Sequence, residues 1–353
     1  MSAPSISSIR NQQEEIERRN LAPYAALSAE SAGRERPEEK CPIRTDFQRD
    51  RDRIIHCKAF RRLKHKTQVF IAPPGDHYVT RLTHTLEVSQ IARSIARGLN
   101  LNEDLAEAIA LGHDLGHTPF GHTGEDVLNE ISPFGFRHNE QSLRVVDQIE
   151  NNGKGLNLTF EAREGIVKHS KSRAGIFGEG WETVGTLEGQ ICKVADVVAY
   201  ISHDVDDALR AGVITEDDIP SVAISVMGRS RSERINALVC DILDSSWDAR
   251  GEGLTSKQIE PIIGVSPSVN EAMNALRDFL FERVYDSELV NREADVVRLV
   301  VRRLYEHFMG HEDQLPGELK LSDEPLARRV VDYVAGMTDQ YALQSAKGLG
   351  LLA

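Results

Sequence analysis

Apolar residues recur at helical spacing along most of this 353-residue chain, and this pattern restricts the fold more than any other feature. The clearest stripes run from Val88 to Leu99 and from Leu187 to Val205, with apolar positions three or four residues apart. Strand-like alternation is sparse. Residues 69–71 and 78–80 flank the turn-forming stretch APPGDH and predict either a small hairpin or a loop. The sequence therefore predicts an all-α fold.

Polar residues at the expected positions mark several helix starts. Thr45 with Gln48 fits a capping box and opens a predicted helix that runs through about residue 63. Asn102 is a suitable cap for a helix that reaches His113. Ser268 with Glu271 predicts a second capping box. Further helices are expected near residues 122–131, 138–149, 160–170 and 186–211, with four or five more between 221 and 340.

These elements suggest three parts of the chain. Residues 1–45 are polar and predict an N-terminal arm that is at best partly ordered. Residues 46–212 hold most of the helical stripes and most of the histidines, and we expect them to form the central domain. Residues 213–353 predict a C-terminal helical segment that packs on this domain.

Composition narrows the class of protein. The net charge of −13 argues against non-specific nucleic-acid binding as the main task, although residues 44–81 are locally basic. No window is apolar for long enough to predict a membrane helix, and the N-terminus has no apolar signal region. The four cysteines are scattered without a CxxC pair, which is typical of reduced thiols. We therefore expect a cytoplasmic globular protein with weak or no nucleic-acid binding.

The stretch GHDLGHTPFGH, residues 112–122, is the strongest chemical signal. His113 and Asp114 are adjacent, and an imidazole beside a carboxylate is a natural pair of ligands for a divalent metal. The glycines and Pro119 predict that a helix ends here. Eight of the twelve histidines lie between His56 and His138, which is unusual for an ordinary packed domain.

Two further residues complete a predicted metal site. His84 lies on the core-facing stripe of its helix, four residues before Val88. Asp196 lies in an apolar stretch of a later helix, and a partly buried carboxylate needs a cation or hydrogen bonds. His84, His113, Asp114 and Asp196 together would offer two nitrogens and two carboxylates to Mg²⁺, Mn²⁺, Fe or Zn²⁺. A solvent-exposed face is the alternative for Asp196, which forms a row with Tyr200 and Asp204.

Four segments of the chain carry a family resemblance. They are RLTHTLEV (81–88), GHDLGHTPFGHTGED (112–126), FRHNEQS (136–142) and KVADVVAYISHDVDDA (193–208). In this helical context they resemble the HD-superfamily deoxynucleoside triphosphate triphosphohydrolases. Residues 52–70 and 332–342 also resemble the bacterial dGTPase-like subgroup of that family. The resemblance covers roughly residues 45–345.

The resemblance implies an HD-domain helical fold with additional C-terminal helices. It also implies a reaction, the metal-dependent hydrolysis of a dNTP to a deoxynucleoside and inorganic triphosphate, with water attacking the α-phosphorus and dGTP as one candidate substrate. Mg²⁺ or Mn²⁺ is the first expectation for the metal, and Fe, Ni, Co and Zn stay open. A homo-oligomer and a second, activating nucleotide are also implied.

Further residues match functional positions of the family. The general acid is either His117 or His122, with Glu125 as its carboxylate partner and His138 near the phosphates. The substrate contacts implied by the resemblance are Arg81 at phosphate and Tyr200 and Asp204 at the sugar, and Arg62, Lys66 and Gln68 are weaker candidates. His56, His65, His77, His169 and His203 have no assigned role.

Two other functions remain open from the sequence. One is a different HD-type nucleotide phosphohydrolase, such as a nucleotidase or a nucleotide phosphodiesterase. The other is a regulator that senses nucleotides or binds nucleic acid with low turnover, for which the basic segment 44–81 would provide the contact surface.

Overall fold

The structure is a computed structural model, and it describes residues 9–69, 78–170, 184–251, 261–320 and 323–352. Within these ranges the chain folds into helices, and its extended pairings are two isolated β-bridges. The predicted all-α fold is therefore confirmed. No described helix combines the length and the apolar content that crossing a membrane requires.

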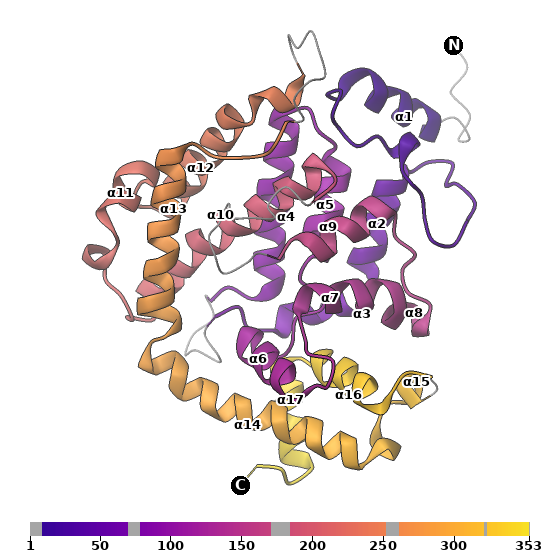
Figure 1. The fold of residues 1–353 in the computed structure, drawn as a ribbon, viewed down its shortest axis with the longest axis vertical. Helices are drawn as coiled ribbons and strands as arrows, with labels where there is room; N and C mark the ends of the chain where they lie inside the picture. Colours follow the sequence, from indigo (N-terminus) through magenta and orange to yellow (C-terminus); the bar gives the residue numbers. More distant parts are fainter. Residues whose placement is uncertain (1–8, 70–77, 171–183, 252–260, 321–322, 353) are drawn as a thin grey trace.

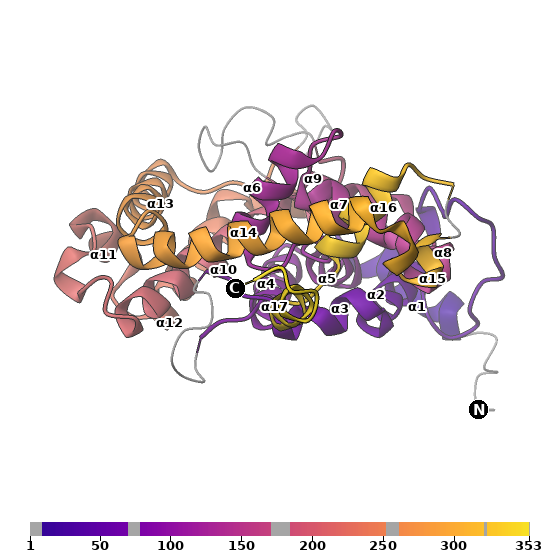
Figure 2. The same cartoon turned by 90° about the horizontal axis from the view of Figure 1, so that it is seen from below.

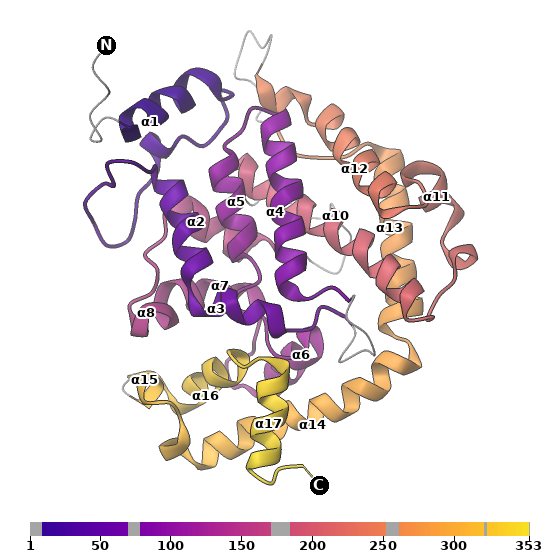
Figure 3. The same ribbon diagram turned by 180° about the vertical axis from the view of Figure 1, so that it is seen from behind.

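Three helices form the centre of the molecule. They are α4 (Arg81–Gly98), α5 (Glu103–Gly112) and α10 (Leu187–Arg210), and each packs against the other two. Both α2 (Asp46–His56) and α9 (Phe160–Lys168) pack on α5 (Figures 1 and 3). The space between these helices is filled by buried Ile, Leu, Val and Ala side chains, whose removal from water stabilises the domain.

The predicted caps hold at two of three positions. Thr45 and Gln48 form the capping box of α2, and the Asn102 side chain caps α5. The helix predicted from Thr45 through about residue 63, however, breaks at Cys57, and a new short helix, α3 (Lys58–Arg62), begins there. The predicted capping box at Ser268 is wrong. Helix α13 (Pro267–Leu280) begins two residues earlier, with Ser266 as its cap, because Pro267 is suited to the first helical position.

Residues 9–45 carry more structure than their polar composition indicates. They contain the helix α1 (Ile9–Asn20), and their charged side chains pair with groups of the central domain. The guanidinium of Arg34 contacts the carboxylate of Asp50, which is fully buried on α2. The backbone N–H of Ala26 donates to Glu188 on α10 at 3.0 Å. In this segment the polar groups thus act as partners for the buried carboxylates of Asp50 and Glu188.

The predicted hairpin near residue 75 is described only at its base. Thr67 and Thr80 form an isolated antiparallel bridge, and Thr80 then caps α4. The stretch APPGDH, with His77, lies outside the described residues.

The C-terminal segment forms two groups of helices. The first contains α11 (Ser221–Met227), α12 (Arg231–Ser245) and α13, and both α12 and α13 pack against α10. The second contains α14 (Glu288–Gly310), α15 (Gly317–Lys320), α16 (Leu326–Ala335) and α17 (Asp339–Gly348). Helix α14 runs along one side of the molecule and packs against α6 (Gly121–Ile131), α16 and α17 around a second apolar cluster (Figures 1 and 2).

Candidate active site

The four predicted metal ligands converge between α4, α10 and the end of α5. The Nε2 atom of His84 lies 3.2 Å from Oδ1 of Asp196 and 3.9 Å from Oδ2 of Asp114. The Nε2 atom of His113 lies 3.4 Å from Oδ1 of Asp114. His84, His113 and Asp114 are buried, whereas the Asp196 side chain keeps 18% of its surface exposed. Three segments that are distant in sequence thus bring two imidazoles and two carboxylates together.

The hydrogen bonding of the His113 imidazole suits a metal ligand. The Nδ1 atom of His113 lies 2.6 Å from the carbonyl oxygen of Ala110 and donates to it, so Nε2 is the nitrogen that can offer a lone pair to a metal. This buried Nε2 makes no hydrogen bond with any described residue. A buried nitrogen lone pair that faces a carboxylate and lacks a donor is the arrangement expected of a ligand without its cation. The residues therefore fit a divalent metal.

Arg81 balances the charge of Asp114. Its Nη1 atom donates to Oδ2 of Asp114 at 2.8 Å, and both side chains are buried. Burial would raise the pKa of Asp114, but the neighbouring His113 and Arg81 outweigh it and hold the pKa well below its usual range. Asp114 is therefore ionised at neutral pH. Two other nitrogens of Arg81, Nε and Nη2, have no hydrogen-bond partner among the described residues.

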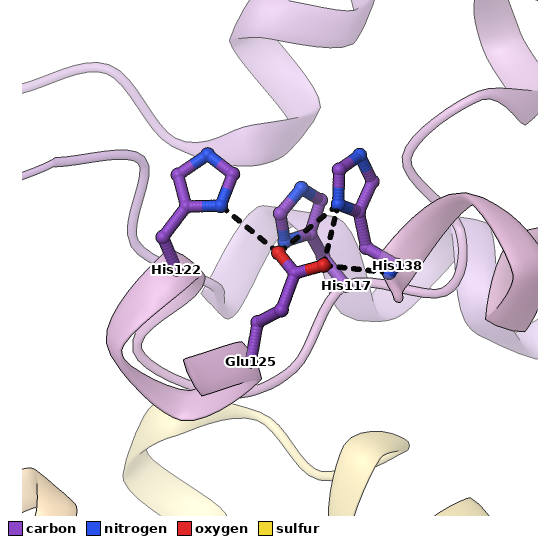
Figure 4. Close-up of side chains that lie close together, drawn as sticks. All are labelled: His117, His122, Glu125 and His138. Atoms are coloured by element: carbon purple, nitrogen blue, oxygen red, sulfur yellow. Dashed lines mark hydrogen bonds and ion pairs between the residues drawn. The ribbon is translucent and has the colours of Figure 1, made fainter. Parts of the chain in front are cut away.

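A second group of side chains adjoins the metal ligands. His122 and Glu125 lie one turn apart on α6, and His138 begins α7 (His138–Arg144). The Glu125 carboxylate is 2.9 Å from Nδ1 of His122 and 2.9 Å from Nδ1 of His138 (Figure 4). The ring of His117 stacks on that of His138 with centroids 4.1 Å apart, and its Nε2 lies 3.3 Å from Asp114. The predicted acid–base residues are thus brought together beside the metal ligands.

The two candidate acids differ in their surroundings. His122 leaves 72% of its side chain exposed, whereas His117 is buried. Burial, and then repulsion from Arg81 and His138, lowers the pKa of His117 well below its ordinary value. Burial would raise the pKa of Glu125, but its hydrogen bonds with His122 and His138 hold the pKa well below the usual range. Glu125 is therefore an anion that orients two imidazoles.

The predicted sugar contacts lie on α10, one and two turns beyond Asp196. Tyr200 is half-buried, and Asp204 is buried. The hydroxyl of Tyr285 donates to Oδ2 of Asp204 at 2.5 Å. The alternative of a solvent-exposed face does not hold for this row, because Asp204 is buried and Asp196 and Tyr200 are only partly exposed.

Arg62 and Lys66 bond to another part of the chain. The Lys66 ammonium donates to the carbonyl oxygens of His117 and, at 2.9 Å, of Ala335, and Arg62 donates to Gly336 at 3.1 Å. Both line a small cavity of about 30 Å³, and its described lining includes none of the four predicted metal ligands. Through these hydrogen bonds Arg62 and Lys66 hold the end of α16 close to the segment that contains His117. Their contact with substrate stays a prediction.

His169 and His203, two of the histidines to which the sequence analysis assigned no role, are buried near the predicted metal ligands. Nε2 of His203 lies 3.0 Å from Nδ1 of His84. The ring centroids of His169 and His113 are 4.9 Å apart. Burial and the neighbouring His113 and His138 lower the pKa of His169 to about 3, so its ring is neutral. Helical spacing carried a signal for both. His203 follows Asp196 by seven residues, and His169 follows Ala162 by seven, so each continues a face of its helix.

Comparison with known proteins places the chain in a family. The HD domain family matches residues 81–201, and the phosphohydrolase-associated domain matches residues 263–347. The deoxyguanosinetriphosphate triphosphohydrolase-like protein of Caldanaerobacter subterraneus is 52% identical over 97% of this chain and 96% of its own length. Proteins of the same name from Desulfatibacillum aliphaticivorans and Clostridium perfringens are 48% and 49% identical over 95% and 94% of this chain, and over 96% and 95% of their own lengths. With such identity along nearly the full length of both partners, the chain belongs to the HD-superfamily deoxyguanosinetriphosphate triphosphohydrolase-like proteins.

Proposed function

We propose that this protein hydrolyses deoxynucleoside triphosphates to the deoxynucleoside and inorganic triphosphate in the presence of a divalent metal. The observation that carries the proposal is the position of the His122–Glu125 pair beside His84, His113, Asp114 and Asp196. The names of the relatives support dGTP as the first substrate to test. Water would attack the α-phosphorus, and the 5′-oxygen of the nucleoside would leave.

His84, His113, Asp114 and Asp196 would hold the metal. A divalent metal bound there would neutralise negative charge on the α-phosphate and polarise the attacking water. Mg²⁺ and Mn²⁺ are the first candidates, and Fe, Ni, Co and Zn also accept this mixture of nitrogen and oxygen ligands. The two aspartates supply two negative charges, so the site matches a dication.

His122 is the side chain that we assign as the general acid. Its Nδ1 faces Glu125 at 2.9 Å, and the ring is largely exposed, so Nε2 is free to meet a leaving group. The anionic Glu125 favours the protonated imidazole, which would give its proton to the 5′-oxygen. The buried, neutral His117 suits this task less well, and we assign it to holding His138 and Asp114 in position.

The remaining contacts concern phosphate and sugar. The unpaired nitrogens of Arg81 support a contact with a phosphate oxygen in addition to its bond with Asp114. Tyr200 beneath the sugar ring would crowd a 2′-hydroxyl, and Asp204 would accept a hydrogen bond from the 3′-hydroxyl. The crowding by Tyr200 would select a deoxyribose, and the Asp204 contact would hold the sugar in position. Arg62 and Lys66 are retained as weaker candidates for phosphate contact.

The proposal is tested by incubating the purified, full-length protein with each of the four dNTPs and with Mg²⁺ or Mn²⁺. The expected products are the deoxynucleoside and triphosphate, resolved by anion-exchange chromatography. Release of pyrophosphate with a nucleoside monophosphate, or of orthophosphate alone, would reject the proposed bond cleavage. The matching ribonucleotides serve as the control for the deoxy preference.

The same material tests the proposed partners. Mixtures of two dNTPs reveal an activating nucleotide if one of them raises the turnover of the other. Light scattering with and without nucleotide measures the homo-oligomer that the family resemblance implies. Titration with single-stranded DNA over a salt series should give weak binding, because the chain carries a net charge of −13.

A further inference from the structure

His169 faces His138 across the site, directly after the last turn of α9. The two Nε2 atoms are 3.2 Å apart, and the side chain of His169 is buried. The rings of His169 and His113 are in edge contact with centroids 4.9 Å apart. His169 thus lies between the residues that would hold the metal and the residues that would supply acid–base chemistry, and the proposed function uses it for neither.

The hydrogen bonds of the two rings determine where their protons are. Nδ1 of His169 lies 2.6 Å from the carbonyl oxygen of Ile166, which can only accept, so this nitrogen carries a proton. Nδ1 of His138 lies 2.9 and 3.0 Å from the carboxylate oxygens of Glu125 and carries a proton for the same reason. The two Nε2 atoms are the remaining nitrogens of these rings, and they face each other. Such a pair repels unless a proton or a metal cation lies between them.

Asp114 supplies a third ligand at the same place. One oxygen of Asp114, one nitrogen of His138 and one nitrogen of His169 all lie within 4.8 Å of one another. This oxygen-and-imidazole set is next to the His84 and His113 nitrogens, with Asp114 common to both groups. A carboxylate shared by two pairs of imidazoles is the arrangement that holds two neighbouring metal ions.

We propose that Asp114, His138 and His169 form a second site for a divalent transition-metal cation such as Mn²⁺. The inference rests on the proposed function for the first site, and it adds a second positive charge where a triphosphate would lie. Two imidazoles and one carboxylate favour a transition metal over Ca²⁺. Another group of His117, His122, Glu125 and His138 is also compact, but there the Glu125 oxygens already bond two imidazoles, and His122 is largely exposed.

The test is a count of metal ions per chain. The full-length protein is stripped with a chelator and titrated with Mn²⁺, and bound metal is measured by equilibrium dialysis and elemental analysis. We expect two Mn²⁺ per chain and an electron paramagnetic resonance spectrum of a coupled pair, since the ions of such sites lie about 4 Å apart. H169F and H169Q should each retain one Mn²⁺ and lose the coupled spectrum. D196N should lose the first ion, and H311N, an exposed histidine on another part of the chain, should keep both.

The outcomes separate this proposal from the proposed function. One Mn²⁺ in the wild type and one in H169F and H169Q, with triphosphate release intact, would overturn the second site and assign the His138–His169 contact to a shared proton. Absence of bound metal together with absence of triphosphate release would overturn the proposed function itself. Anomalous scattering from Mn²⁺-soaked crystals of the wild type reads both positions without any variant, so misfolding of a variant does not obscure the answer.

Discussion

The Nδ1 atom of His84 lies 3.0 Å from Nε2 of His203, so one imidazole holds the ring of a predicted metal ligand in place. Nδ1 of His203 is in turn 2.7 Å from Oδ1 of Asp204, and Oδ2 of Asp204 accepts a hydrogen bond from the hydroxyl of Tyr285. If Nε2 of His84 binds a metal, its Nδ1–H donates to His203. The chain of contacts then connects the metal ligand to the side chain that would meet the 3′-hydroxyl.

From this relationship we predict that H203F weakens metal binding without removing any ligand. Partners that orient a ligating imidazole are typically worth roughly 10- to 100-fold in metal affinity. Titration calorimetry with Mn²⁺ on the metal-free protein measures the loss. The exposed His311 provides the control, and H311N should bind Mn²⁺ as the wild type does. An unchanged affinity in H203F would show that His203 only fills space.

A second prediction separates the two aspartates. D196N should lose the Mn²⁺ of the first site and turnover with little change in the Tm of the metal-free protein, because Asp196 keeps 18% of its side chain exposed. D114N should lower this Tm as well, because it leaves the buried Arg81 without its ionic partner, at about 3 to 5 kcal/mol. Differential scanning calorimetry of both variants after chelation gives the comparison. Equal Tm values for the two would contradict the assigned role of Arg81.

Periodicity predicted most of the helices, and the failures have local causes. The helix predicted to run from Thr45 through about residue 63 breaks at Cys57. The Cys57 thiol caps the next helix by accepting from the N–H of Phe60, and helix propensity does not predict such a change of hydrogen-bond partner. The start of α13 was misplaced because Ser266 and Ser268 both suit a cap, and the choice depended on Pro267. Such choices depend on one hydrogen bond, which the sequence pattern does not resolve.

The site was predictable where motif and helical face agree. His84 and His113 lie on faces that the apolar stripes direct inward, and the structure brings them together with Asp114. Asp196 belongs to a row on another face of its helix, and only the apolar residues around it favoured a buried position. His169 was left unassigned because its contact with His138 joins two helices through space, at 3.2 Å. Pairwise distances between helices depend on how the whole core packs, and a single sequence carries no record of them.

A third prediction concerns the general acid. H122A should lower turnover of a dNTP by roughly 10²- to 10⁴-fold, the usual contribution of a positioned acid. The loss should nearly vanish for an analogue of the same dNTP in which sulfur replaces the bridging 5′-oxygen, because a thiolate leaves without a proton. Steady-state kinetics on both substrates gives the two ratios. H117A should instead impair both substrates alike, because the buried His117 supports Asp114 and His138. An equal loss on both substrates in H122A would dismiss the assignment.

A fourth prediction concerns the pH dependence of stability. Glu188 is fully buried, and burial raises its pKa from 4.5 to about 7. The folded state therefore binds more protons than the unfolded state between these values, and stability falls as pH rises through this window. E188Q keeps an oxygen for the N–H groups of Ala26 and Asn102 and carries no charge. It should match the wild type near pH 4.5 and exceed it by roughly 2 to 3 kcal/mol above pH 7.

Urea unfolding across this pH range measures the difference between E188Q and the wild type. E306Q, at an exposed position on α14, is the matched control and should follow the wild-type curve at every pH. A constant difference between E188Q and the wild type across the range would mean that Glu188 does not titrate in this window.

The last prediction tests the close contact that positions His138. A Cβ atom on Gly116 would lie 2.1 Å from the backbone nitrogen of Ser142 and 2.5 Å from the carbonyl oxygen of His138. Because backbone atoms cannot move aside as a side chain does, G116A must displace α7 and with it the His138 ring. We expect a loss of roughly 1 to 3 kcal/mol in unfolding free energy, as for other overpacked sites, together with weaker Mn²⁺ binding. G310A, where a Cβ meets no atom within 4 Å, should leave both unchanged. Urea unfolding and Mn²⁺ titration of the two variants give the answer, and wild-type stability in G116A would show that α7 is free to shift.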